Sequence, residues 1–132
     1  MKLEILNFSD TYISDISFFD KIKNLKELNL SSCVNIKDFK PLSKIEKLEI
    51  IDVSYSNISD ILFFDKIKNL KELDLSSCKK IKDFTPISKI EKLKILKFNN
   101  LNISDISFLE KNKHIKELYL CGCAPNFTIC LK

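Results

Sequence analysis

The stretch Leu70-Lys71-Glu72-Leu73-Asp74-Leu75-Ser76-Ser77-Cys78 decides how the rest of the chain folds. Its pattern is an apolar residue, two free positions, an apolar residue, one free position and a third apolar residue. Nearly the same letters stand at 25–33, and a variant stands at 115–123. Three further copies are present, so the six repeats begin at 3, 25, 48, 70, 93 and 115. Self-similarity with a period of 22 or 23 residues predicts a repeat architecture.

Each repeat changes its hydrophobic period halfway along. In the first half, alternate apolar residues such as Leu28 and Leu30 predict a short strand with one buried face. In the second half, apolar residues three apart, such as Leu42 and Ile45, fit one or two turns of helix. Such a segment is too short to be stable alone. The pattern therefore predicts a parallel solenoid in which each unit is stabilised by its neighbours.

Two polar positions recur between these halves. An Asp stands two residues after a recurring Ile, and we expect it to accept backbone N–H bonds from the following turn. A small hydrogen-bonding residue stands three positions after the last apolar strand residue, except in the fifth repeat, where Leu101 replaces it. The Asp residues are Asp15, Asp38, Asp60, Asp83 and Asp105, and the small residues are Thr11, Cys33, Ser56, Cys78 and Cys123.

The consensus Leu-x-x-Leu-x-Leu-x-x-(Asn/Cys/Ser/Thr)-x-Ile-x-Asp resembles leucine-rich repeats of the short, 22-residue class. These occur in bacterial internalins and in the nuclear regulatory repeat proteins of the type-1 phosphatase. The resemblance covers about residues 3–123. It implies an α/β fold, a right-handed leucine-rich repeat solenoid with six parallel short strands on the concave face and short helical or 3-10 segments on the convex face. It also implies that the small polar residues form an internal ladder. The fold by itself carries many functions.

The two ends of the chain depart from the repeat. We expect a single leucine-rich repeat domain over 1–132, with a capping tail over 121–132. Within that tail, Phe127, Ile129 and Leu131 are the expected core plugs. Asn112 stands where other repeats have Ile, so the last helical segment is expected to pack loosely. The first strand has no cap before it and leaves an open sheet edge, which favours a homodimer as one alternative.

The residues that enzymes require are scarce. With one His and one Gly, the chain has no base placed beside a nucleophile and no phosphate-binding loop. We therefore predict no enzyme, no catalytic residues and no cofactor. No carboxylate cluster offers enough ligands for a metal. Cys121, Cys123 and Cys130 supply three thiols, for which zinc or a disulfide stays an alternative to packing.

The charge pattern argues against nucleic acid and membranes as partners. The net charge is +4 and all 22 basic residues are Lys, whereas bidentate phosphate recognition favours Arg. No apolar run approaches the roughly 20 residues of a membrane span. Met1-Lys2 runs directly into the first repeat, and five Cys is an odd number for a disulfide framework. We expect an intracellular, cytoplasmic protein.

Function is expected on the concave strand face, where the free positions of equivalent strands form rows about 4.8 Å apart. Carboxylates and Ile residues dominate these rows and favour an acidic and apolar groove that binds a basic segment of another protein, with Tyr119 as an aromatic anchor. Alternatives are that Asp52 and Asp74 are merely solvated, that the unit is structural or self-assembling, or that it regulates a phosphatase by fold analogy. The predicted contact residues are Ile5, Asn7, Glu27, Asn29, Ile50, Asp52, Tyr55, Glu72, Asp74, Ile95, Lys97, Glu117 and Tyr119, with a third row at Ser9, Ser31, Ser54, Ser76, Asn99 and Cys121.

Overall fold

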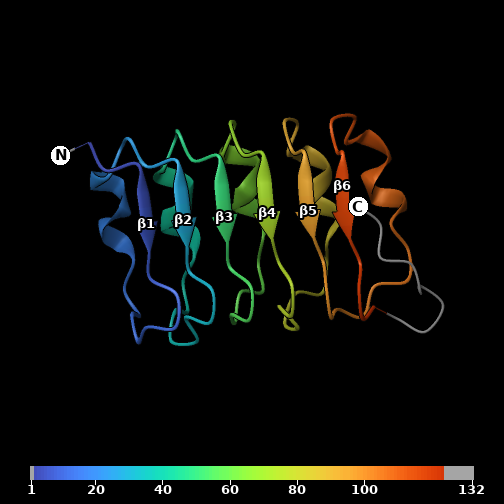
Figure 1. Ribbon diagram of the computed structural model, residues 1–132, viewed down its shortest axis with the longest axis horizontal. Helices are drawn as coiled ribbons and strands as arrows, with labels where there is room; N and C mark the ends of the chain where they lie inside the picture. Colours follow the sequence, from blue (N-terminus) through green and yellow to red (C-terminus); the bar gives the residue numbers. More distant parts are fainter. Residues whose placement is uncertain (1, 124–132) are drawn as a thin grey trace.

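Six short parallel strands form one sheet in chain order, as Figure 1 shows. The computed structural model describes residues 2–123. Because each strand pairs with the next strand in sequence, the chain advances by one strand per repeat and the sheet spans the length of the solenoid. The strands are β1 (Ile5–Asn7), β2 (Glu27–Asn29), β3 (Ile50–Asp52), β4 (Glu72–Asp74), β5 (Ile95–Lys97) and β6 (Glu117–Tyr119).

Equivalent residues of successive repeats lie side by side across the sheet. Ile5 is the partner of Glu27, and Glu27 in turn is the partner of Ile50, and the same register continues to β6. A single-residue slip would exchange the buried and exposed faces of a strand. The inward Leu residues therefore fix this register, and the predicted alignment of equivalent strand residues in rows is confirmed.

Within the described residues, five 3-10 helices lie behind the sheet and form the opposite face (Figure 1). Each has five residues, and the second and fourth have Pro in their first turn, where the missing N–H is tolerated. The predicted short helical segments are confirmed in their 3-10 form. They are η1 (Ser17–Lys21), η2 (Lys40–Lys44), η3 (Leu62–Lys66), η4 (Thr85–Lys89) and η5 (Ser107–Lys111).

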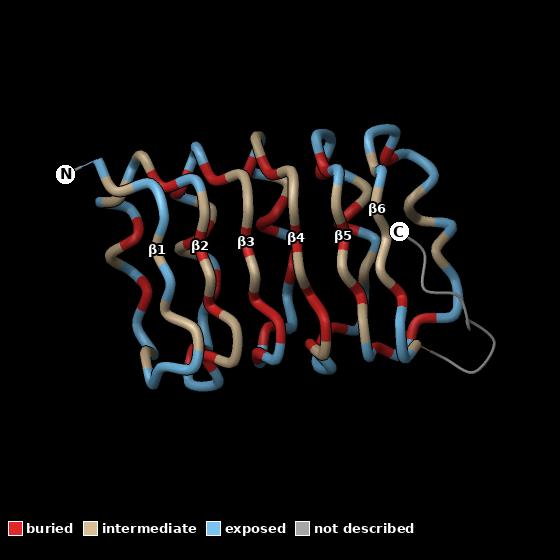
Figure 2. Tube along the Cα trace, viewed as in Figure 1, coloured by how far each residue is buried: buried red, intermediate tan, exposed pale blue. Residues whose placement is uncertain are grey.

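The core lies between the sheet and the 3-10 helices and is best sealed in the middle of the solenoid. Leu73 and Leu75 in β4 and its continuation are completely buried, whereas Leu6 and Phe8 in the first repeat are only partly buried. Figure 2 shows buried segments running along the inside of the solenoid. A solenoid repeat buries its faces against two neighbours, so a terminal repeat keeps one side of its core open.

The two recurring polar positions act as the sequence predicts. The Oδ1 atom of each recurring Asp accepts the backbone N–H two residues further on, at 2.8–3.0 Å. In the ladder, the thiol of Cys33 donates to the carbonyl of Phe8 at 3.0 Å, and Cys78 donates to Val53 at the same distance. These thiols satisfy loop carbonyls of the preceding repeat, so both Cys residues are structural.

The expectation that Asn112 loosens the last helical segment is only partly right. None of the residues in η5 is fully buried, but Asn112 itself is 7% exposed and tied to the preceding repeat. Its Nδ2 atom donates to the carbonyls of Ile87 at 3.0 Å and Ile90 at 3.2 Å. Its Oδ1 atom has no hydrogen-bond partner. The expected plugs Phe127, Ile129 and Leu131 lie outside the described residues.

Candidate protein-binding face

A shallow hollow of about 290 Å³ runs across the outer face of β1 to β5, and we call it the strand groove. Nine of the predicted contact residues line it, together with three inward strand residues. The sheet register therefore gathers residues that lie up to 92 positions apart in the sequence. The lining residues are Ile5, Leu6, Asn7, Glu27, Leu28, Asn29, Ile50, Ile51, Asp52, Glu72, Asp74 and Lys97.

Four predicted contact residues lie outside the strand groove. Ile95, Glu117 and Tyr119 continue the same two rows on β5 and β6. Tyr55 is different, because it lies in the turn after β3 with a backbone φ of 56° and 58% exposure. It lines a separate depression with Lys79, Lys80 and Asn100. The structure therefore places Tyr55 at the loop edge of the solenoid, away from the rows.

The carboxylates of Asp52 and Asp74 have a structural role that the sequence analysis missed. Their Oδ1 atoms accept the backbone N–H of Ser54 and Ser76, each at 2.9 Å. Asn7 and Asn29 make the same contact in the first two repeats. Asx residues commonly bond the backbone two positions on, so the alternation of Asn and Asp in this row was the available signal. A neutral Asn performs this role equally well, so the negative charges of Asp52 and Asp74 are not needed for the turns.

The electrostatic environment of Asp74 differs from that of an ordinary surface carboxylate. Partial burial raises the pKa of Asp74 above its usual range, and the nearby charge of Asp52 acts in the same direction. The hydrogen bond from Ser76 and the charge of Lys97 oppose this rise in pKa. Two neighbouring carboxylates in one row disfavour each other across a sheet. This pair would therefore gain from a cation bound in the strand groove.

Lys97 closes the carboxy-terminal end of the strand groove and already makes a contact of this kind. Its Nζ atom lies 3.6 Å from Oε1 of Glu72 and 5.5 Å from the ring centroid of Tyr119. The hydroxyl of Tyr119 in turn donates to Oε1 of Glu117 at 3.2 Å. Partial desolvation and the charge of Glu117 raise the pKa of Tyr119. An ammonium group is therefore accommodated between a carboxylate and an aromatic ring on this face.

The middle of the third predicted row is buried rather than an open surface. Ser54 and Ser76 are buried, at 5% and 6% exposure. The hydroxyl of Ser54 is 2.9 Å from that of Ser31, and the hydroxyl of Ser76 accepts the backbone N–H of Asn99. These small side chains hold neighbouring loops together, so Ser54 and Ser76 are not open to a partner as the row pattern predicted.

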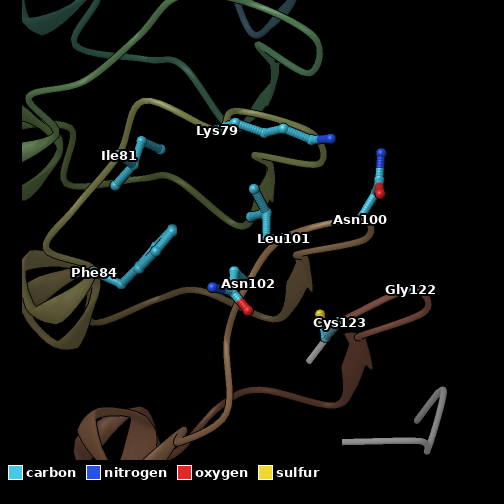
Figure 3. Close-up of a pocket in the computed structure, with 8 residues that line it drawn as sticks. All are labelled: Lys79, Ile81, Phe84, Asn100, Leu101, Asn102, Gly122 and Cys123. Atoms are coloured by element: carbon cyan, nitrogen blue, oxygen red, sulfur yellow. The ribbon is translucent and has the colours of Figure 1, made fainter. Parts of the chain in front are cut away.

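A second hollow, of about 320 Å³, lies at the loop edge between the fourth, fifth and sixth repeats. In Figure 3, Ile81 and Phe84 lie on one side and Gly122 and Cys123 on the other, with Leu101 between them. Leu101 occupies the ladder position without a polar group, so the ladder hydrogen bond is missing there, and Cys123 resumes it in the next repeat by donating to the carbonyl of Phe98 at 3.2 Å. The sequence analysis noted Leu101 but predicted no hollow there. The described chain ends beside it, at residue 123.

Within residues 2–123, no group of three His, Cys, Asp or Glu residues is arranged to hold a metal ion. Cys33, Cys78 and Cys123 are free thiols, and burial raises the pKa of the Cys78 thiol, which disfavours its reactive thiolate. Cys130 lies outside the described residues. Among the described helices, none combines the length and the hydropathy that crossing a bilayer requires.

Comparisons with known proteins agree with this geometry. The structure is similar to that of internalin C2 from Listeria monocytogenes, with 26% sequence identity and a TM-score of 0.83 over 93% of this chain and 54% of that chain. It also shares its fold with an internalin F from the same organism, with 23% identity and a TM-score of 0.70 over 92% of this chain and 42% of that chain. The chain thus spans about half the length of these structures. A search among curated proteins found no significant match.

The family match rests on the sequence as well as on the fold. The family model described as leucine-rich repeats, in two copies, matches residues 2–44, 23–66 and 46–89 in overlapping pairs of repeats. Together these matches cover two thirds of the chain, and they agree with the six-stranded sheet and its 3-10 segments. The chain belongs to the leucine-rich repeat family.

Proposed function

We propose that this chain is a non-enzymatic binding module that recognises a basic segment of another protein through the strand groove. Leucine-rich repeat proteins typically act as protein-interaction modules, and no catalytic family matches the chain. The observation that carries the proposal is the groove itself, in which four carboxylates on β2 to β4 lie beside the exposed Ile5 and the half-buried Ile50. Glu27, Asp52 and Asp74 make no ion pair among the described residues, so a cationic partner would find them available.

The position of the Lys97 side chain supports a positive charge on the expected partner. Its ammonium group rests against Glu72 and over Tyr119, so this face accepts one cation from the chain itself. Burial also makes the ionised form of Asp74 less favourable, and a bound ammonium or guanidinium group would offset that penalty. The same sites would repel an acidic partner. We also propose an intracellular location, which rests on the sequence alone.

The test removes charge without disturbing the turns. In the double variant Asp52→Asn plus Asp74→Asn, the amide oxygens still accept the N–H groups of Ser54 and Ser76, as Asn7 and Asn29 do in wild type. We expect a Lys-rich peptide to bind at least tenfold more weakly to this variant by fluorescence anisotropy at low salt. Raising the salt concentration should also weaken binding of the peptide to the wild-type protein.

The matched control removes the same number of charges from the opposite face. Asp20→Asn plus Asp65→Asn changes two carboxylates in η1 and η3, far from the strand groove. This variant should bind the peptide as wild type does. Equal losses in both variants would show only a general charge effect, and full binding by the groove variant would rule out the strand groove as the site.

A second candidate function, self-assembly, is favoured by the exposed edge strand. Among the described residues β1 pairs on one side only, and Ile5 on it is 62% exposed. Unpaired strand edges can add another strand. Sedimentation velocity at two concentrations a hundredfold apart tests this candidate, because a monomer at both concentrations would exclude it.

A further inference from the structure

The row of the strand groove nearest the amino-terminal ends of the strands alternates strictly between Ile and Glu. Its members are Ile5, Glu27, Ile50, Glu72, Ile95 and Glu117, paired in register from β1 to β6. The alternation arises because the sequence repeats every 45 residues, that is, every two strands. A carboxylate therefore recurs on every second strand, with an apolar side chain halfway between.

This alternation sets a distance that a partner must match. Neighbouring strands lie about 4.8 Å apart, so successive Glu side chains of this row are about 9.6 Å apart. A partner lying across the strands, along the solenoid, would meet carboxylates at this spacing. The strand groove itself contains Glu27 and Glu72, and Glu117 extends the row beyond it.

Backbone conformations differ in whether they can present cations at this spacing on one side. In a polyproline II helix every third side chain points the same way, and three residues advance about 9.3 Å. In a β-strand the same side recurs every second residue, at about 6.6 or 13.2 Å. In an α-helix residues three or four apart share a face, about 4.5 to 6 Å apart, and the same-face spacing closest to 9.6 Å is seven residues, about 10.5 Å. The polyproline II conformation gives the closest match.

We propose that the partner of the strand groove is a polyproline II segment with a Lys or Arg at every third position and apolar residues between. This inference rests on the proposed function and specifies its ligand. Each cation lies against one Glu of the row, and the residues between the cations contact Ile50 or Ile95. A segment in this conformation is already extended, so binding it orders little additional backbone.

Lys97 is the internal competitor for one of these positions. Its Nζ atom is 3.6 Å from Oε1 of Glu72, the carboxylate that a second cation of the partner would contact. The side chains of Lys97 and Glu72 are about a third and a quarter exposed, so this ion pair is only partly shielded from water. Surface pairs of this kind contribute little stability, and a partner can displace one readily. Removing the Lys97 ammonium while keeping its aliphatic stem should therefore strengthen binding of the partner.

The experiment compares peptides of equal composition and charge. The first is a labelled twelve-residue peptide repeating Lys-Pro-Leu, and the second contains the same residues with Lys at alternating spacings of two and four. Binding to wild-type protein is measured by fluorescence anisotropy at low salt. We expect the first peptide to bind about tenfold more tightly, and Lys97→Met to increase its affinity about threefold.

Protein variants locate the effect. Glu27→Gln plus Glu72→Gln should abolish the preference between the two peptides, whereas Glu91→Gln, an exposed carboxylate outside the groove, should leave it unchanged. Equal binding of both peptides to wild type, with loss in Asp52→Asn plus Asp74→Asn, would overturn the spacing inference and leave the proposed function standing. If neither peptide binds wild type, the proposed function falls together with the inference.

Discussion

The first four repeats and the last two differ in the residues that bond the loops, form the ladder and follow the 3-10 helices. In the first four, Asn or Asp on each strand accepts a loop N–H, a hydroxyl or thiol fills the ladder position, and an inward Ile follows each 3-10 helix. In the last two, Lys97 and Tyr119 replace the Asx residues, Leu101 interrupts the ladder, and Asn112 replaces Ile. The family model matches only residues 2–89, which is the first group.

This difference shows that the repeat tolerates loss of its consensus hydrogen bonds when new ones form nearby. In the fifth repeat Oδ1 of Asn99 accepts the N–H of Cys121 at 3.0 Å, from a position two residues beyond the usual Asx site. Asn112 bonds the carbonyls of Ile87 and Ile90, which also keep their backbone donors. The strand positions that no longer bond the loop carry Lys97 and Tyr119, the cation and the aromatic ring of the proposed binding face.

The largest expected effect concerns the aromatic cluster between the fourth and fifth repeats. Phe98 is completely buried, and its ring lies 5.2 Å from that of Phe84 and 6.2 Å from that of Phe108. Phe98→Ala should lower the free energy of unfolding by about 3–5 kcal/mol, because it removes apolar contact and leaves a cavity. The measurement is equilibrium urea unfolding followed by circular dichroism.

The matched substitution is Phe8→Ala, at the same repeat position in the first repeat. Phe8 is only partly buried and packs on Phe18 and Phe19 at the open end of the core. Its removal should cost about half as much, because part of its surface already contacts water. Equal costs would mean that the first repeat is better covered than its exposure indicates.

The second prediction restores the consensus at the divergent end. Asn112→Ile should raise the free energy of unfolding by about 1–2 kcal/mol, because it removes the unpaired Oδ1 atom and adds buried apolar surface. The carbonyls of Ile87 and Ile90 retain the backbone donors Ile90 at 3.0 Å and Leu93 at 3.3 Å. Asn112→Ala, which leaves the site unfilled, should be less stable than the Ile variant. A destabilised Ile variant would show that the two Asn hydrogen bonds outweigh the orphaned oxygen.

The sequence predicts the fold well because the fold depends on letters that repeat. The spacing of Leu70, Leu73 and Leu75 gives the strand, its buried face and, through the next copy, the register. The recurring Asp predicts the turn contact for the same reason. What the sequence could not give was the behaviour of single departures: the hydrogen bonds of Asn112, the burial of Ser54, or the hollow beside Leu101. Each of these features depends on which groups of the adjacent repeat lie nearby in the folded structure, and the repeat pattern of the sequence does not specify those contacts.

The site was predicted less completely, because the place of a residue in a strand row does not reveal whether its side chain already makes hydrogen bonds within the protein. The strand groove and its acidic rows follow from the alternating pattern. The contact from Asp74 to Ser76 depends on the turn, and the placement of Tyr55 depends on a left-handed backbone that the Leu pattern does not specify.

The third prediction concerns the turn residue with a left-handed backbone. At this position the residues of the last two repeats tolerate a positive φ better than the Tyr of the third repeat. The equivalent residues in the last two repeats are Asn100 and Gly122, with φ of 58° and 74°, whereas the third repeat has Tyr55 at 56°. A bulky residue in this region is strained, and Asn tolerates it. Tyr55→Asn should therefore stabilise the protein by about 1 kcal/mol in urea unfolding.

The reciprocal exchange tests the same reasoning from the other side. Asn100→Tyr should destabilise the protein by about 1 kcal/mol or more, because it introduces the strain and removes the hydrogen bond from Nδ2 of Asn100 to Oγ of Ser77. If Tyr55→Asn also leaves peptide binding unchanged, Tyr55 lies outside the binding face, as its position in the turn implies.

The smallest effect concerns the boundary between the two groups of repeats, where Asp74 on β4 faces Lys97 on β5. Because burial raises the pKa of Asp74 in the folded protein above its ordinary value of 3.8, the folded state holds this proton more tightly than the unfolded state. The stability that Asp74 contributes is therefore fully present below the unfolded pKa and is lost as the pH rises through the folded pKa. At neutral pH, Asp74→Asn should stabilise the protein by less than about 1 kcal/mol.

The difference between variant and wild type isolates this contribution from the other carboxylates. Hydrogen bonds lower the pKa values of Asp15, Asp83 and Asp105, so those groups lose stability as the pH falls and mask Asp74 in wild type alone. Urea unfolding of both proteins across the acidic range should show the advantage of Asp74→Asn shrinking as the pH falls towards 3.8. An advantage that grows instead would mean that Lys97 stabilises the Asp74 carboxylate more than burial disfavours it. The first four repeats would then already have, in Lys97, the cation that their acidic row requires.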